Sequence, residues 1–179
     1  ATARALAGDG WQVVVGARRR DRVEALARHI GGRAHVLDVT DPASVEAFAA
    51  AVPDDCRLLV NNAGGALGWA PVTEADENEW RTMYDTNVLG VVRVTKALLG
   101  RLEASGDGQV ITIGSIAGHE PYPNGAGYNA AKFAVRGADA GAVLDRVSAG
   151  AVNAHAGVIT YTQWLGEDGG ILADLTVTR

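Results

Sequence analysis

Cysteine is nearly missing from this 179-residue chain, which contains a single one, Cys56. One cysteine cannot form a disulfide within the chain or build a zinc site of several thiolates. Sequences so poor in cysteine are typical of compartments where thiols stay reduced. We therefore expect a cytoplasmic protein without a metal site.

Long uncharged apolar runs are also missing. None reaches the roughly 18 residues that a membrane-spanning helix needs, and no basic-then-apolar signal segment opens the sequence. The 16 lysines and arginines are outnumbered by 21 aspartates and glutamates, which gives a net charge of −5. Nucleic-acid-binding proteins usually carry a basic surface. We expect neither a membrane nor a nucleic acid among the partners.

The chain does have enough apolar material for a globular core, since 47% of its residues are hydrophobic. Short β-branched runs, typical of buried strands, alternate with amphipathic stripes, typical of helices. The expected strands are 11–17, 34–39, 57–61 and 110–113, and the expected helices are 1–7, 20–30, 42–51, 77–104 and 127–148. Asp41 before Pro42 predicts a helix N-cap, and Asp76 with Glu79 predicts a capping box.

This alternation predicts an α/β fold, a doubly wound parallel sheet with helices on both faces. Two further alternating segments, 158–165 and 171–178, predict a C-terminal β-hairpin. Parallel sheets of this kind bind ligands at the carboxyl ends of their strands. Functional residues should therefore follow strands.

Tyr128 and Lys132 lie four residues apart on an expected helix, so their side chains share a face. A phenol, with an ordinary pKa near ~10, is a poor acid–base group at neutral pH. A neighbouring ammonium favours the phenolate, so such a pair can exchange a proton with a carbonyl or alcohol oxygen. A half-buried tyrosine beside an exposed lysine on an ordinary helix would show the same spacing. The pair alone therefore does not distinguish a catalytic site from a structural one.

Other polar residues stand where strands end. Asp38 and Val39 close the strand 34–39, Asn61 closes the strand 57–61, and Ser115 follows the strand 110–113. Asn87 lies inside a helical stretch, where asparagine is an indifferent former and predicts a kink. Each residue has an alternative role as a cap, a turn or a surface polar group. Those alternatives do not explain why all of these polar residues and the Tyr128–Lys132 pair occur together in this order.

Residues 1–137 resemble the short-chain dehydrogenase/reductase family. The resemblance is carried by DVTD at 38–41, NNAG at 61–64, DTNVLG at 85–90, IGSIAG at 113–118 and YNAAK at 128–132. It implies a Rossmann-type sheet and reversible hydride transfer between a nicotinamide cofactor and a small carbonyl or alcohol.

The resemblance also implies roles for these residues. Tyr128 would be the catalytic acid–base, and Lys132 would hold the nicotinamide ribose and depress the tyrosine pKa. Ser115 would position the substrate carbonyl, and Asn87 would support a proton-relay water. The residues implied at the adenosine half of the cofactor are Asp38, Val39, Asn61, Ala63 and Gly64.

The segment after the strand 11–17 bears on the choice of cofactor. An NAD-preferring enzyme usually places a carboxylate there for the ribose 2′-hydroxyl, whereas this chain has Arg18 and Arg19. A guanidinium suits a 2′-phosphate, so NADP is the first choice, NAD the second, and Arg18 precedes Arg19 as its ligand. The alternative is a solvated basic helix start, for which Asp21 and Glu24 offer ion-pair partners.

Two departures from the family pattern lead to further expectations. The family opens with a strand and a TGxxxGxG turn, and this chain starts within the helix after them, so we expect a sheet truncated at the N-terminus. The absent strand would lie between the strands 11–17 and 57–61 and leave a slot of about 9–10 Å, twice the strand spacing. The hairpin 158–178 could cover the sheet or, less readily, fill that slot.

The second departure concerns residues 138–179, which we expect to be a helix and hairpin of different origin from residues 1–137. The piece YTQWL with DGGILADLTVTR resembles a fragment of the aminomethyltransferase (glycine-cleavage T-protein) family. The alternative is an ordinary amphipathic helix followed by a hairpin.

The sequence thus predicts an NADP-dependent oxidoreductase acting on a carbonyl or alcohol. The alternatives are a non-catalytic fragment or composite reading frame and, last, a folate-dependent aminomethyltransferase-like module. Loop residues Trp69, His119, Tyr122 and Pro123 are candidates for lining a substrate pocket. The family resemblance also implies a homo-oligomer, a dimer or tetramer, formed through the helices 77–104 and 127–148.

Overall fold

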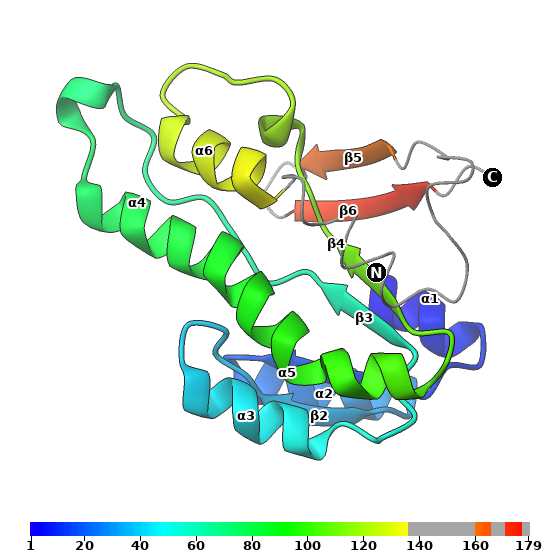
Figure 1. The fold of residues 1–179 in the computed structure, drawn as a ribbon. Helices are drawn as coiled ribbons and strands as arrows, with labels where there is room; N and C mark the ends of the chain where they lie inside the picture. The colour runs from blue at the N-terminus through cyan, green and yellow to red at the C-terminus, as the bar shows by residue number, and fades with distance from the viewer. Residues whose placement is uncertain (136–159, 166–170, 177–179) are drawn as a thin grey trace.

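Strands and helices alternate along the chain in the predicted order (Figure 1). The computed structural model describes residues 1–135, 160–165 and 171–176. The first half contains α1 (Thr2–Gly8), β1 (Val14–Ala17), α2 (Arg20–Ile30), β2 (Arg33–Val36), α3 (Pro42–Ala51) and β3 (Leu58–Asn61). The second half contains η1 (Val72–Glu74), α4 (Glu77–Tyr84), η2 (Asp85–Leu89), α5 (Gly90–Ala104), β4 (Gln109–Thr112), η3 (Ile116–Gly118), α6 (Ala126–Val135), β5 (Thr160–Leu165) and β6 (Ile171–Thr176).

The described strands form three separate pairs. β1 and β2 run parallel with Val14 opposite Arg33, and β3 and β4 run parallel with Leu58 opposite Gln109. Within the described part of the chain, β1 does not pair with β3, so the parallel sheet is divided where we expected a slot. β5 and β6 form the predicted antiparallel hairpin, and among the described strands each pairs only with the other, so they do not fill that slot. The expected helix extension from 136 to 148 lies outside the described residues.

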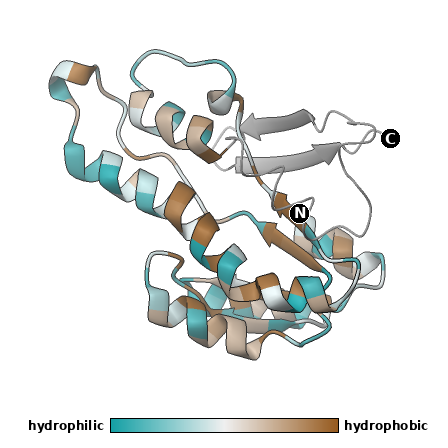
Figure 2. Cartoon of the chain, in the orientation of Figure 1, coloured by the Kyte–Doolittle hydropathy of each residue, from teal (hydrophilic) through white to brown (hydrophobic). Residues whose placement is uncertain are grey.

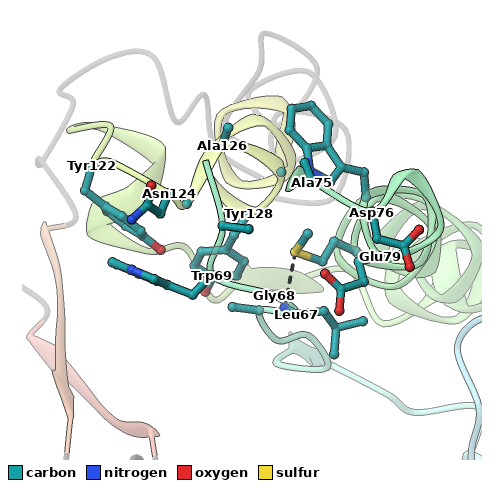
Figure 3. Close-up of a pocket in the computed structure, with 16 residues that line it drawn as sticks. Leu67, Gly68, Trp69, Ala75, Asp76, Glu79, Tyr122, Asn124, Ala126 and Tyr128 are labelled. Carbon is teal, nitrogen blue, oxygen red and sulfur yellow. Dashed lines mark hydrogen bonds between the residues drawn. The ribbon is translucent and has the colours of Figure 1, made fainter. Parts of the chain in front are cut away.

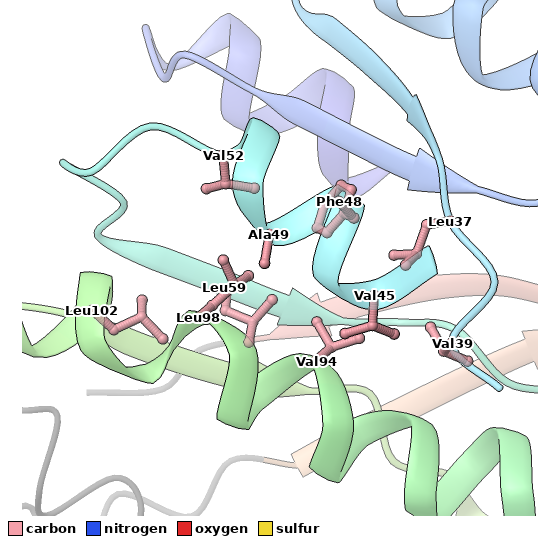
Figure 4. Close-up of a cluster of buried hydrophobic side chains, with 10 residues drawn as sticks. All are labelled: Leu37, Val39, Val45, Phe48, Ala49, Val52, Leu59, Val94, Leu98 and Leu102. Atoms are coloured by element: carbon pink, nitrogen blue, oxygen red, sulfur yellow. The ribbon is translucent and has the colours of Figure 1, made fainter. Parts of the chain in front are cut away.

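The main core lies between α3, α5 and β3 (Figure 4). Val94, Leu98 and Leu102 follow one another at intervals of four residues and form one buried face of α5, with Leu102 fully buried. α3 presents a similar stripe towards them. The remaining members of this cluster are Leu37, Val39, Val45, Phe48, Ala49, Val52 and Leu59. The apolar colouring of β3 and β4 in Figure 2 agrees with a sheet that is covered by helices.

Local signals fix where α3 and α4 begin. Asp41 accepts a hydrogen bond from the backbone N–H of Ala43 at 3.0 Å and so caps α3, as predicted. Asp76 caps α4 by accepting from the N–H of Asn78 at 2.8 Å. The capping box expected from Glu79 is wrong, because the Glu79 carboxylate lies against Gly68 in the loop that follows β3.

The kink predicted at Asn87 is a π-helical turn. This turn, η2, joins α4 to α5 without a break in the helical backbone. Such widened turns redirect one side chain relative to the regular helix, and here that side chain is Asn87, which is 1% exposed. None of the described helices is long and apolar enough to cross a membrane.

Candidate active site

The carboxyl ends of β3 and β4 lie side by side, because the two strands are parallel and in register through Asn61 and Thr112. The loop after β3 runs towards α4, and the loop after β4 leads through η3 to α6 (Figure 1). η3 and α6 pack against each other, as do α4 and α6. This edge of the sheet therefore gathers segments that are far apart in the sequence.

Lys132 is buried at this edge, with 7% of its surface exposed. Its Nζ donates a hydrogen bond to the carbonyl oxygen of Ile113 at 2.9 Å, and it lies 5.7 Å from the centre of the Tyr128 ring. Burial disfavours the ammonium and lowers the pKa of Lys132 to about 8. The amine thus stands beside the Tyr128 side chain at the end of β4.

Tyr128 is itself 7% exposed and packs with Met83 and Ala117. Ser115 starts η3, and its Oγ accepts from the N–H of Ala117 at 3.2 Å. η3 lies close to α6, since a Cβ on Gly118 would come 2.8 Å from the carbonyl oxygen of Lys132. The segments that carry the tyrosine, the lysine and the serine are therefore packed together at one edge of the sheet.

Asn87 fastens the loop after β3 to the π-helical turn. Its Oδ1 accepts from the N–H of Gly65 at 3.1 Å, and its Nδ2 donates to the carbonyl of Gly65 at 3.0 Å and to that of Met83 at 2.7 Å. The neighbouring Gly64 faces the same group, because a Cβ there would lie 2.5 Å from Asn87 Oδ1 and 3.7 Å from Lys132 Nζ. Asn87 and Lys132 thus share a neighbour in Gly64.

The backbone at Gly64 packs so closely against the Asn87 side chain that any larger residue would collide with it. Ala63 and Gly64 are both exposed, and the Lys132 amine stands close behind Gly64. A position of this kind lets a ligand approach the main chain closely. An exposed main chain with an amine close behind it would fit a ligand that carries hydroxyl groups, as the expected cofactor does. No group of three or more His, Cys, Asp or Glu within the described residues could hold a metal.

The side chain of Asn61 lies elsewhere. It is 7% exposed, and its Nδ2 donates to Thr95 Oγ1 at 2.9 Å on α5. Its backbone carbonyl accepts from the N–H of Ile113 at 2.8 Å. Asn61 thus ties the end of β3 to a helix and to β4, and its side chain is not brought together with Lys132 and Tyr128.

The residues expected at the 2′-phosphate and the adenine stand after β1 and β2. Arg18 and Arg19 are exposed. Asp38 Oδ1 accepts from Thr40 Oγ1 at 2.7 Å and from the Thr40 N–H at 2.9 Å. These two bonds and the charge of Arg18 outweigh partial burial and lower the pKa of Asp38. Val39 is a core residue, 7% exposed, and its backbone carbonyl accepts a hydrogen bond from the guanidinium of Arg93 at 3.2 Å.

A pocket opens beside Tyr128, between α4, the start of α6 and the loop after β3 (Figure 3). Trp69 and Tyr122 stack on each other in its wall, with ring centres 5.2 Å apart and planes 14° from parallel. Both were candidates from the sequence, whereas His119 and Pro123 do not line this pocket.

Three lining residues on α4 were missed: Glu79, Trp80 and Met83. Their spacing of one helical turn, Glu79 to Met83, was a usable signal of a shared face. Glu79 also has the spacing from Asp76 that is typical of a capping box, and this local role concealed its place in the pocket.

Comparison with known proteins agrees with this arrangement. The family model described as short chain dehydrogenase matches residues 1–163, which extends beyond the boundary that we expected at 137. An uncharacterized oxidoreductase of Mycobacterium tuberculosis is 51% identical over 134 residues, which cover 75% of this chain and 53% of that protein. The serine 3-dehydrogenase of Agrobacterium fabrum is 41% identical over 141 residues, covering 76% and 56%.

A solved structure shares the fold as well. The closed form of a serine dehydrogenase complexed with NADP+ superposes with a TM-score of 0.71 at 37% identity, covering 75% of this chain and 56% of that one. This chain spans about half the length of the curated relatives it matches. The α/β architecture, the packed edge that carries Tyr128 and Lys132, and the family match over most of the chain lead to one conclusion: the protein belongs to the short-chain dehydrogenase family.

Proposed function

We propose that the protein transfers hydride between NADP(H) and a small carbonyl or alcohol compound, with Tyr128 as the acid–base. The observation that carries this proposal is the buried Lys132 amine, which stands 5.7 Å from the Tyr128 ring and is held by the carbonyl of Ile113. A buried amine with a pKa near 8 still carries its proton over much of the neutral range. Family membership and an NADP+-bound relative support the choice of chemistry.

The chain's own residues divide the work as follows. In the reducing direction the Tyr128 hydroxyl gives its proton to the substrate oxygen, and in the oxidising direction the phenolate takes one back. The ammonium of Lys132 stabilises the phenolate through its charge. Ser115, at the start of η3, positions the substrate oxygen. When bound, the nicotinamide supplies or accepts the hydride.

For Asn87 we propose a positioning role. Both polar atoms of its side-chain amide are already bonded to Gly65 and Met83. This saturation favours a part in holding the loop next to Lys132 over the direct support of a relay water by its amide.

We propose NADP over NAD because of the basic segment after β1. Arg18 would pair with the 2′-phosphate, with Arg19 as the second choice, and no carboxylate occupies positions 17–20. Asp38 and the backbone of Val39 would face the adenine, and Ala63 and Gly64 would lie under the ribose. Asn61 would contribute by bracing β3 against α5.

The decisive experiment titrates the purified chain with NADPH and then measures reduction of a carbonyl panel. Submillimolar binding and turnover that Tyr128→Phe abolishes without loss of fold would support the proposal. Absence of both would favour a non-catalytic fragment. Tetrahydrofolate binding would favour the folate-dependent module suggested by residues 138–179. Retained turnover in Tyr128→Phe would refute the role of the phenol.

We also propose that the protein forms a homo-oligomer. Large apolar side chains remain exposed on three helices, including Tyr84 on α4, Val92 on α5 and Phe133 on α6. Such surfaces are typical of protein interfaces. Sedimentation velocity would measure the oligomeric state. The single cysteine supports the further proposal of a cytoplasmic location.

A further inference from the structure

The pocket beside Tyr128 has a chemical character of its own. It is walled by the Trp69–Tyr122 stack on one side and by α4 on the other, and Tyr128 belongs to its lining (Figure 3). If Tyr128 is the acid–base of the proposed function, this pocket receives the part of the substrate that is attached to the reacting carbon. The side chains in it therefore select the substrate.

Glu79 is the half-buried charged residue of this pocket. Its carboxylate lies against Gly68, whose φ of +66° favours glycine, and a side chain at position 68 would displace it. The described part of the chain offers Glu79 no ion-pair partner. A half-buried carboxylate without a cation is a ready partner for a positive ligand group.

The other charges around the pocket have the same sign or are engaged elsewhere. Asp76, also in the lining, is bound to the N–H of Asn78 as the cap of α4. Among the described lining residues there is no lysine or arginine. Lys132 lies outside the lining and donates to the carbonyl of Ile113. A carboxylate or sulfonate on the substrate would meet repulsion here, with no cation to offset it.

The aromatic wall favours a cation as well. Trp69 and Tyr122 stack with their planes nearly parallel, and both residues line the pocket, so two aromatic rings stand in its wall. Gly125 permits this placement, because a Cβ there would collide with the Tyr122 ring. The electron-rich faces of tryptophan and tyrosine attract ammonium groups. Carboxylate and aromatic wall thus point to the same ligand chemistry from independent sides.

We propose that this pocket selects a carbonyl or alcohol substrate that carries an ammonium group, with Glu79 as the specificity-determining residue. The inference rests on the proposed hydride transfer for its reacting carbon, but the recognition of charge depends on the pocket alone. An amino ketone or amino alcohol would place its nitrogen towards Glu79 and the Trp69–Tyr122 stack.

The test uses three methyl ketones that differ in one substituent: aminoacetone carries an ammonium group, hydroxyacetone a hydroxyl group and acetoacetate a carboxylate. NADPH-dependent reduction gives kcat/KM for each, and saturation-transfer NMR measures binding without any need for turnover. We expect aminoacetone to be preferred over acetoacetate by about fivefold or more, the size of a partly exposed charge interaction. Glu79→Gln, which keeps size and shape, should remove this preference.

The matched control is Glu77→Gln, the same change on the same helix. Glu77 is exposed and pairs with Arg81 at 2.8 Å, away from the pocket lining. It should keep the preference of the unmodified protein. Circular dichroism of both variants shows that the fold is retained.

The two readouts separate this inference from the proposed function. Charge-selective binding that depends on Glu79, without turnover, would support the pocket and contradict the enzyme. Turnover with equal use of aminoacetone and acetoacetate, or a preference that survives in Glu79→Gln, would overturn the inference alone. Neither binding nor turnover of any of the three ketones would overturn the inference, whereas the proposed function would still be decided by NADPH binding and the wider carbonyl panel.

Discussion

The side-chain amide of Asn87 holds both backbone polar groups of Gly65, accepting from its N–H at 3.1 Å and donating to its carbonyl at 3.0 Å. The two residues are 22 positions apart, and each belongs to a segment that faces the proposed active site. One side chain thus replaces the pairing that a strand partner would provide for this stretch of loop. The π-helical turn directs the amide to this place.

Replacing Asn87 by alanine should therefore loosen the loop and destabilise the fold. The change leaves the polar groups of Gly65 and the carbonyl of Met83 without their present partner. We expect a loss of about 2–3 kcal/mol in the free energy of unfolding, measured by urea denaturation. Asn78→Ala, at an exposed site on α4, is the control. A loss within about 0.5 kcal/mol, as is usual at surface sites, would contradict the role of Asn87 in holding the loop.

Adjacent glycines offer a matched test of the loop that Asn87 holds beside the proposed cofactor site. A Cβ at Gly64 would meet Asn87 Oδ1 at 2.5 Å, whereas a Cβ at Gly65 would meet nothing within 4 Å. Gly64→Ala should displace the Asn87 amide and shift the loop that it holds, which should weaken NADPH binding about tenfold or more. Gly65→Ala should leave NADPH binding nearly unchanged. Fluorescence titration of NADPH gives both affinities. Equal losses of affinity would mean that loop flexibility, and not the close contact between Gly64 and Asn87, matters.

The local parts of this fold were accessible from the sequence. The cap at Asp41, the helix over 20–30 and the kink at Asn87 each depend on residues within one or two turns of one another. Propensities and spacing act at that range. The parallel pairing of β1 with β2 and β3 with β4 follows from the alternation of strands and helices.

The contacts that shape the site were not accessible, because they join distant segments. Asn61 could equally have faced a ligand, and only the approach of α5 gives its amide a partner in Thr95, 34 positions away. Glu79 had a plausible local role as a cap, and it turns to the pocket because a glycine at position 68 lets the loop come close. Residue types and their spacing in the sequence do not show which distant segments come together in the fold.

Cofactor preference should depend on Arg18. Arg18 is exposed directly after β1, which pairs with β2 up to Ala17 and Val36, so it stands at the carboxyl ends of both strands. Arg18→Ala should reduce the NADP-to-NAD ratio of kcat/KM about tenfold, the size of one charge-assisted hydrogen bond. Arg28→Ala, exposed in the last turn of α2, should not change it. A larger effect of Arg19→Ala would transfer the role to that residue.

The buried amine of Lys132 should make stability rise with pH above neutrality. Its pKa of about 8 in the folded protein lies well below the value in the unfolded chain, ordinarily about 10.4. Between these values the unfolded state binds more protons than the native one, so the free energy of unfolding increases with pH. This contribution is absent below the native pKa and complete above the unfolded one.

The measurement compares urea denaturation of the unmodified protein and Lys132→Met at several pH values in that window. Other titrating groups are common to both proteins, so the difference between their slopes isolates Lys132. We expect the unmodified protein to gain up to about 1.4 kcal/mol per pH unit relative to the variant, the value of one proton. Lys96→Met, at an exposed position of α5, should show the slope of the unmodified protein. Identical slopes for Lys132→Met and the unmodified protein would mean that the amine keeps its ordinary pKa despite its burial, and the electrostatic pairing proposed for it with Tyr128 would then lack the desolvated environment that strengthens it.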